Sequence, residues 1–281
     1  MSEAFGKHAA RGPIGVFDSG IGGLTVVRAL RRRLPGEDIL YFGDTARVPY
    51  GTKSSATVLR FSRECLGFLA RRQVKLLVVA CNTASAVALP VLSGAVELPL
   101  IGVIAPGVAA ALERSRRRRI GVIGTAATIT SGAYRQGLEA PDPAPEVFER
   151  PCPLFVPLAE EGWTEGEVPR LVAHHYLDGL LAEGIDALIL GCTHYPLLRD
   201  VIAEVAGEGV ALIDSGEEAA RGTAAVLTAR GLANPRQAGG RCTVYVSDRP
   251  RHVERIGTAF LGEQLEAVTL VDQSEVPWYE R

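Results

Sequence analysis

The sequence predicts an α/β protein built from two similar lobes, each a mostly parallel sheet flanked by helices. Short aliphatic runs alternate with stretches of helical periodicity, and most of these runs are unbroken, as expected of strands covered on both faces. Landmarks in the first half recur in the second half at a nearly constant offset. The 281 residues suffice for one large domain or two moderate ones.

Seven aliphatic runs are expected to form buried strands, and an eighth segment alternates apolar and polar residues as an edge strand does. The expected strands cover residues 14–17, 38–43, 75–80, 100–104, 119–124, 186–191 and 210–214, with the edge strand at 243–248. The Pro-rich segment 141–153 is expected to be an ordered loop inside the second lobe.

An internal repeat relates the two predicted lobes. IGVFDSGIGGLTV starts at Ile14 and IGVIGTAATITSG at Ile120, an offset of 120 − 14 = 106, while Cys81 and Cys192 are offset by 192 − 81 = 111. We therefore expect pseudo-two-fold symmetry with a site between the lobes. The predicted boundaries assign residues 1–102 and 213–281 to the first lobe and residues 103–212 to the second.

Composition excludes several classes of protein. The formal net charge of −2 gives no general attraction to nucleic acid, and the arginine clusters fall at predicted helix ends, where the helix dipole favours cations. Polar residues and prolines interrupt the longest apolar region, 76–112, so no membrane helix is expected. Five irregularly spaced cysteines do not suit a disulfide framework. We expect a cytoplasmic protein with reduced thiols that binds neither nucleic acid nor membrane.

Two of the cysteines follow predicted strands in matching contexts, ACNTASA around Cys81 and GCTHYPLL around Cys192. Ligands of open α/β sheets bind at the carboxyl ends of the strands. A thiol at a helix N-terminus is expected to have a lowered pKa, and the free N–H groups of that turn can hold a carboxylate. The pair predicts a site, whereas Cys65, Cys152 and Cys242 are expected to pack as structural residues.

Other predicted strand ends and turns add polar groups to this site. Asp18 and Ser19 follow the first strand in FDSGIGG, which does not fit the GxGxxG pattern of a dinucleotide site. Thr125 and Thr128 follow the equivalent strand of the second lobe. A metal site is not expected, because no CxxC or HExxH spacing is present.

Six segments in the order DSGIGGLTV, GDTARVPYG, ACNTASA, GVIGTAATITS, CPLFVPLAEEG and GCTHYPLL resemble the glutamate racemases, within the aspartate/glutamate racemase family. The likeness continues through LIDSGEEAA and the C-terminal part, so it covers nearly the whole chain apart from the first dozen residues. It implies a cofactor-independent homodimeric isomerase that interconverts L- and D-glutamate and supplies D-glutamate for peptidoglycan.

The resemblance also implies roles for individual residues. Cys81 would deprotonate the D-isomer and Cys192 the L-isomer, one acting as thiolate base while the other acts as thiol acid. Asp18 would assist Cys81, whereas His194 and Glu160 would assist Cys192. The residues that match substrate-contacting segments are Asp18, Ser19, Pro49, Tyr50, Gly51, Asn82, Thr83, Thr125, Thr128, Thr193 and His194.

Three other functions fit parts of the sequence. A racemase of aspartate or hydantoins, or a related decarboxylase with one working cysteine, would share the fold, although GCTHY and the PYG turn argue against it. A non-catalytic module could close its lobes on an amino acid. A cysteine hydrolase could use Cys192 and His194 as nucleophile and base, although side chains two residues apart meet only on the same face of a strand.

Overall fold

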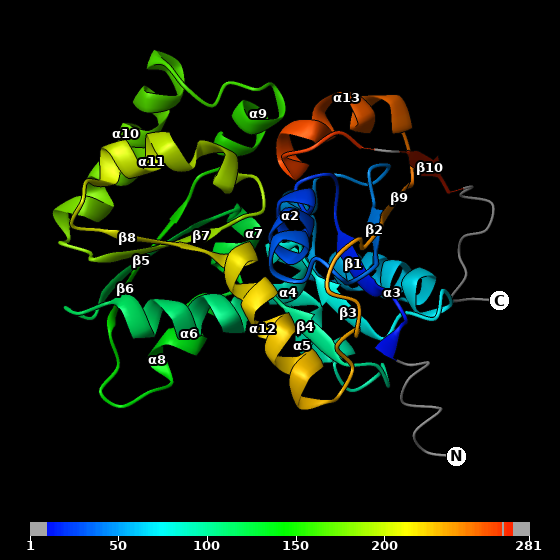
Figure 1. Cartoon of the computed structure of the whole chain (residues 1–281). Coiled ribbons are helices and arrows are strands. Elements are labelled where there is room, and N and C mark those ends of the chain that lie inside the picture. Colours follow the sequence, from blue (N-terminus) through cyan, green and yellow to red (C-terminus); the bar gives the residue numbers. More distant parts are fainter. Residues whose placement is uncertain (1–9, 266, 272–281) are drawn as a thin grey trace.

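The computed structural model describes residues 10–265 and 267–271, which form two parallel sheets flanked by helices (Figure 1). One sheet has six strands in the order β10-β9-β2-β1-β3-β4, and the other has four in the order β6-β5-β7-β8. All the strand pairings within the described residues are parallel. The predicted α/β class with two sheets is confirmed.

The strands are short, as is typical of doubly covered parallel sheets. Their bounds are β1 Ile14–Asp18, β2 Ile39–Gly43, β3 Leu76–Val79, β4 Leu100–Gly102, β5 Arg119–Gly124, β6 Glu146–Pro151, β7 Ala187–Gly191, β8 Ala211–Asp214, β9 Cys242–Val246 and β10 Val268–Leu270. The helices are α2 Leu24–Arg33, α3 Ser55–Ala70, α4 Asn82–Val87, α5 Leu89–Leu92, α6 Ile104–Arg114, α7 Ala126–Thr130, α8 Ala133–Glu139, α9 Phe155–Glu160, α10 Glu167–Ala182, α11 Arg199–Ala206, α12 Ser215–Ala229 and α13 Pro250–Leu261, with 3-10 turns η1 Tyr50–Thr52 and η2 Tyr195–Leu198.

The strand order repeats between the two sheets. The order β2-β1-β3-β4 of the first sheet has the same topology as β6-β5-β7-β8 of the second, and β9 and β10 extend only the first. Cys81 follows β3 after one residue, and Cys192 directly follows β7, the equivalent strand. The repeat in sequence therefore corresponds to a repeat in topology. The exact lobe boundaries at residues 102 and 212 stay a prediction.

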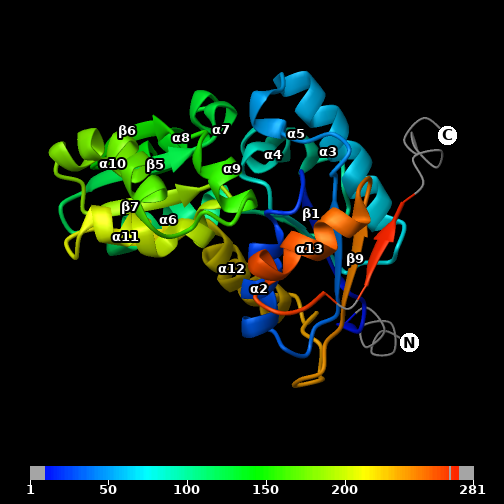
Figure 2. The same ribbon diagram turned by 90° about the horizontal axis from the view of Figure 1, so that it is seen from above.

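Helices cover both faces of each sheet. Along β1, Val16 packs into one hydrophobic cluster with side chains of α2 and α13, while the next residue, Phe17, packs into a second cluster on the α3 face. In the four-stranded sheet, α10 and α11 lie on one face and α6 and α8 on the other (Figure 1). Seen from above, α12 crosses between the two halves beside α2 (Figure 2).

Two predictions about sheet edges were wrong. The segment expected to be an edge strand forms β9, which pairs with β2 on one side and β10 on the other, so β10 is the edge. Within the expected loop 141–153, residues Glu146–Pro151 form β6, an edge strand paired with β5. The two strands that the sequence did not predict, β6 and β10, both lie at sheet edges. They are partly exposed and carry polar residues, so neither shows the continuous apolar run that identifies a buried strand.

The arginine clusters lie at helix ends, as predicted. Arg31, Arg32 and Arg33 form the last turn of α2, and α6 ends at Arg114. Within residues 10–265 and 267–271, the helices are all too short or too polar to span a bilayer.

Candidate active site

The carboxyl ends of β1, β3, β5 and β7 surround a cavity of about 220 Å³ between the two sheets. Cys81 and Cys192 both line it, and each is only 6% exposed. The other lining residues are Ser19, Pro49, Tyr50, Gly51, Thr52, Asn82, Thr83, Thr125, Ala126, Pro153, Val156, Pro157, Thr193 and His194. The two thiols therefore share one space that accommodates a small molecule.

On the first-sheet side, Cys81 is the N-cap of α4. Its sulfur accepts the backbone N–H of Ala84 at 3.5 Å, and its thiol donates to the Ser19 hydroxyl at 3.3 Å. Asp18, at the end of β1, is fully buried beside this pair, and its Oδ2 accepts the N–H of Gly20 at 2.9 Å. The other carboxyl oxygen, Oδ1, is buried without a partner among the described residues.

The protonation of this pair differs from the sequence expectation. Burial, together with the nearby charge of Asp18, raises the pKa of Cys81 to about 12, although the hydrogen bonds with Ser19 and Ala84 act in the opposite direction. Burial also raises the pKa of Asp18. The expected lowering of the Cys81 pKa was wrong, because α4 has only six residues and its N-terminus does not offset desolvation. Cys81 is a thiol at neutral pH in the unliganded protein.

On the second-sheet side, His194 lies between Cys192 and Glu160. Its Nδ1 is 3.8 Å from the Cys192 sulfur, and its Nε2 is 3.1 Å from Oε1 of Glu160. Burial lowers the pKa of His194, but the hydrogen bonds and negative charges of Cys192 and Glu160 outweigh it and raise this pKa to about 10. The hydrogen bond from His194 in turn lowers the pKa of Glu160. His194 is therefore an imidazolium at neutral pH.

Cys192 was expected at a helix N-terminus, but the chain first passes through Thr193 and His194 and then forms the 3-10 turn η2. Positive charge beside this thiol thus comes from His194 and not from a helix dipole. A residue of the other half of the molecule holds Thr193 in place, because the Thr25 hydroxyl of α2 donates to the Thr193 carbonyl at 2.9 Å.

Three threonine hydroxyls from the two sheets form a cluster, and two of them, those of Thr83 and Thr125, line the cavity. Thr83 follows β3, whereas Thr125 and Thr128 follow β5, and the three Oγ1 atoms lie 3.0–3.2 Å apart. Thr125 also caps α7 by accepting the Thr128 N–H. Each hydroxyl can rotate to donate, so this cluster can bind an anionic group without a basic side chain.

Two glycines allow these elements to approach closely. A Cβ on Gly22 would lie 2.3 Å from Oγ1 of Thr193 and 2.5 Å from Nδ1 of His194. A Cβ on Gly51 would lie 2.9 Å from Cβ of Thr125. Both positions join one half of the molecule to the other, so the site forms only because these residues lack side chains.

Comparison with known proteins agrees with this geometry. A sequence model of the family described as Asp/Glu/Hydantoin racemase matches residues 14–223. The chain belongs to this family. Its members are isomerases, and a chain similar to this one, 54% identical over 252 residues that cover 90% of this chain and 93% of the relative, is the glutamate racemase of Geobacter metallireducens.

Two solved structures of the racemase family are also similar to this chain. Glutamate racemase from Francisella tularensis, in complex with D-glutamate, has a TM-score of 0.86 and 42% identity, with 94% of this chain and 98% of that chain covered. The Thermus thermophilus enzyme, in complex with beta-chloro-D-alanine, has a TM-score of 0.87 and 49% identity, with coverage of 95% and 99%. The two-lobed racemase fold is therefore confirmed.

The residues predicted from the sequence gather around this one site. All of them line the cavity except Asp18, Thr128 and Glu160. Thr128 and Glu160 form hydrogen bonds with the lining residues Thr83 and His194, and Asp18 directly precedes the lining residue Ser19. The prediction missed five lining residues, namely Thr52, Ala126, Pro153, Val156 and Pro157. Each is adjacent to a predicted residue or lies in the segment CPLFVPLAEEG, so four of the five lie within the racemase motifs, as apolar members that were overlooked, and Thr52 directly follows one.

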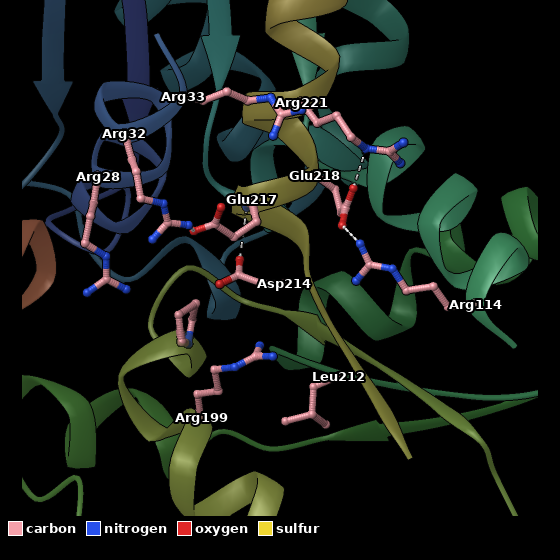
Figure 3. Close-up of a pocket in the computed structure, with 11 residues that line it drawn as sticks. Arg28, Arg32, Arg33, Arg114, Arg199, Leu212, Asp214, Glu217, Glu218 and Arg221 are labelled. Carbon is pink, nitrogen blue, oxygen red and sulfur yellow. Dashed lines mark hydrogen bonds and ion pairs between the residues drawn. The ribbon is translucent and has the colours of Figure 1, made fainter. Parts of the chain in front are cut away.

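A second cavity, of about 470 Å³, lies where α2, α6, α11 and α12 meet (Figure 3). Six arginines and three carboxylates line it, and Figure 3 shows Glu217 facing Arg32 and Glu218 between Arg114 and Arg221. Arg32 pairs with Glu217, and Arg114 and Arg221 both pair with Glu218. The three paired arginine side chains are 45–67% exposed, so we interpret this cavity as a solvated ion-pair network across the helices.

Within the described residues, groups of three or more His, Cys, Asp or Glu side chains placed to hold a metal ion do not occur.

Proposed function

We propose that this protein is a glutamate racemase that moves a proton through Cys81 and Cys192. The observation that carries the proposal is that both thiols line one small cavity from different sheets. Racemisation requires a proton to leave one face of Cα and another to arrive on the opposite face. Two sulfur atoms on opposite walls of the cavity suit this requirement, whereas one nucleophile is sufficient for a hydrolase.

The proposed reaction with L-glutamate begins at Cys192. Its thiolate takes the Cα proton, the C–H electron pair stays on the carbon and spreads into the adjacent carboxylate, and the Cys81 thiol then donates its proton to the other face. The product is D-glutamate, with a thiol at Cys192 and a thiolate at Cys81. The raised pKa of Cys81 supports this order, because the thiol is protonated before L-glutamate arrives.

His194 and Asp18 are proposed to assist the two thiols differently. The imidazolium of His194 is able to donate a hydrogen bond to negatively charged sulfur at Cys192, and Glu160 keeps the ring charged. Asp18 lies beside Cys81 with an unpartnered oxygen, so it can accept a proton or bind the substrate ammonium group. The two walls of the cavity thus differ in charge: a cation on one side and a buried carboxyl on the other.

Glutamate is the proposed substrate because the relatives that share half of the residues are glutamate racemases and the cavity offers two separate groups of donors. One group is the hydroxyls of Thr83 and Thr125, which lie 3.0 Å apart, and the other is the backbone N–H groups that follow Cys81 and Cys192. The lining residues include no Lys or Arg. Two carboxylates can therefore be held by neutral donors, which can also stabilise the negative charge that develops when Cα is deprotonated.

The wider biological setting is part of the same proposal. By its resemblance to the family we expect a cytoplasmic homodimer, with lobes divided near residues 102 and 212, that supplies D-glutamate for peptidoglycan and needs no cofactor. The basis of this part is the similarity to glutamate racemases over nine-tenths of the chain.

The decisive test is chiral chromatography of purified protein incubated with single enantiomers and no added cofactor. We expect each enantiomer of glutamate to reach a 1:1 mixture, while L-aspartate and 5-substituted hydantoins remain unchanged. Racemisation of aspartate or a hydantoin with glutamate unchanged would show that the protein is a family member that acts on another substrate. Calorimetric binding of glutamate without racemisation would identify a binding module.

A further inference from the structure

The side chain of Asn82 is held by groups that the proposed mechanism does not use. Its Oδ1 accepts the hydroxyl of Tyr134 at 2.7 Å and that of Ser215 at 3.4 Å. The single hydroxyl proton of Ser215 is shared with the Leu190 carbonyl near the end of β7, which at 3.0 Å is the closer of its two acceptors. Asn82 is 2% exposed, Tyr134 1% and Ser215 2%, so these bonds form in a site closed to bulk water.

The other half of the same amide is unsatisfied. Nδ2 of Asn82 is buried and has no hydrogen-bond partner among the described residues. Buried donors in native proteins nearly always have a partner, and an exception at a binding cavity points to a group supplied by the ligand. Asn82 lines the cavity directly after Cys81, the thiol that the proposed reaction places next to the reacting carbon and its carboxylate.

We propose that Tyr134 and Ser215 are positioning residues that turn the Asn82 amide so that its Nδ2 donates to the α-carboxylate of the substrate. The inference rests on the proposed racemase function. Negative charge grows on this carboxylate when Cα loses its proton, so a donor fixed in advance stabilises the transition state more than the bound substrate. Without the Tyr134 and Ser215 hydroxyls, the amide is free to present its oxygen, which repels a carboxylate.

The three residues come from different parts of the fold. Tyr134 belongs to α8 and packs in the hydrophobic cluster of the four-stranded sheet, Asn82 begins α4 beside the six-stranded sheet, and Ser215 begins α12. The donor is therefore aimed correctly only while the two halves are docked. The orientation of this proposed substrate-binding group therefore depends on the contact between the two halves.

The test is a double-mutant cycle measured with L- and D-glutamate. We expect Tyr134→Phe to lower kcat/KM about three- to tenfold, mainly through kcat, because one hydrogen bond to the amide is lost. In an Asn82→Ala background the same substitution should change kcat/KM by less than about 1.5-fold, because the group that Tyr134 orients is gone. Asn82→Asp should be worse than Asn82→Ala, because an oxygen replaces the donor.

Matched variants separate positioning from general stability. Tyr176→Phe also removes a buried tyrosine hydroxyl from the second half, one that accepts the Leu154 N–H at 3.2 Å, and should leave kcat/KM unchanged. Ser215→Ala provides a second probe if Tyr134→Phe does not fold. Equal losses from Tyr134→Phe with and without Asn82, or no loss at all, would overturn the inference. An inactive wild-type protein would instead refute the proposed function.

Discussion

Cys81 and Cys192 line the same cavity but pack into different hydrophobic clusters. Cys81 belongs to the cluster that contains Phe17 and Tyr50, whereas Cys192 belongs to the cluster that contains Leu188 and Tyr195. Each thiol is therefore fixed to its own wall. The separation of the two sulfur atoms depends on how closely the walls approach, and the proposed proton transfer depends on the same spacing.

Replacement of either thiol tests the two-sided mechanism. Cys81→Ser and Cys192→Ser should each lower racemisation on the order of a thousandfold or more, because a serine hydroxyl is too weak an acid to alternate with a thiolate. Polarimetry with both enantiomers measures the loss. Cys242→Ser, in β9 far along the sheet from the cavity, is the matched control and should keep full activity. Normal turnover by Cys192→Ser would eliminate the mechanism.

Glu160→Gln should lower the pKa of His194 from about 10, because the amide cannot supply the negative charge that stabilises the imidazolium. The measurement is an NMR titration of the imidazole, with Glu161→Gln as the control at the neighbouring exposed position. An unchanged titration would show that Glu160 has no electrostatic role.

The same pKa shift predicts how stability depends on pH. His194 binds its proton more tightly in the folded state, where the pKa is about 10, than in the unfolded state, where it is about 6.5. Its contribution to stability is fully present below pH 6.5 and is lost as the pH rises through 10. Chemical denaturation should therefore show that His194→Gln costs less stability at pH 10 than at pH 7. A constant difference would contradict the shift.

Gly22→Ala should displace the segment that carries Thr193 and His194, because the new methyl group would lie 2.3 Å from the Thr193 hydroxyl. We expect a loss of about 1–3 kcal/mol in the free energy of unfolding, together with at least a tenfold fall in kcat/KM. Gly94→Ala is the control, since no atom lies within 4 Å of its added Cβ. Full activity in Gly22→Ala would show that the loop can shift without consequence.

Thr125→Val should raise KM for glutamate about tenfold with a smaller effect on kcat, because one of the three clustered hydroxyls is removed while both thiols remain. Thr125→Ser retains both the hydroxyl and the helix cap, so it should restore most of the affinity. If serine and valine behave alike, the hydroxyl does not bind substrate.

The sequence revealed the α/β class and the internal repeat because buried parallel strands leave unbroken apolar runs such as KLLVVA and DALILG. The edge strands β6 and β10 were missed because one face or edge is exposed and their residues are mixed. Residues of the candidate site that follow strands were predictable, because the carboxyl ends of parallel strands lie at the same edge of a sheet. The resemblance to glutamate racemases added Glu160, which would otherwise pass for a surface charge.

Other features depend on the surroundings and could not be predicted from residue order. The raised pKa of Cys81 arises from complete burial beside Asp18, and the sequence motif alone indicated the opposite direction. The bonds from Tyr134 and Ser215 to Asn82 join positions 52 and 133 residues apart. A local pattern contains no information about contacts at that separation.

The chain passes from the six-stranded sheet to the four-stranded one through α6 and returns through α12, and these two helices pack against each other. The two halves are therefore joined by two covalent connections that lie side by side. They limit how far one half can slide or twist against the other. Gly107 of α6 and Ser215 of α12 meet at this double crossing, where a Cβ on Gly107 would lie 3.6 Å from Cβ of Ser215.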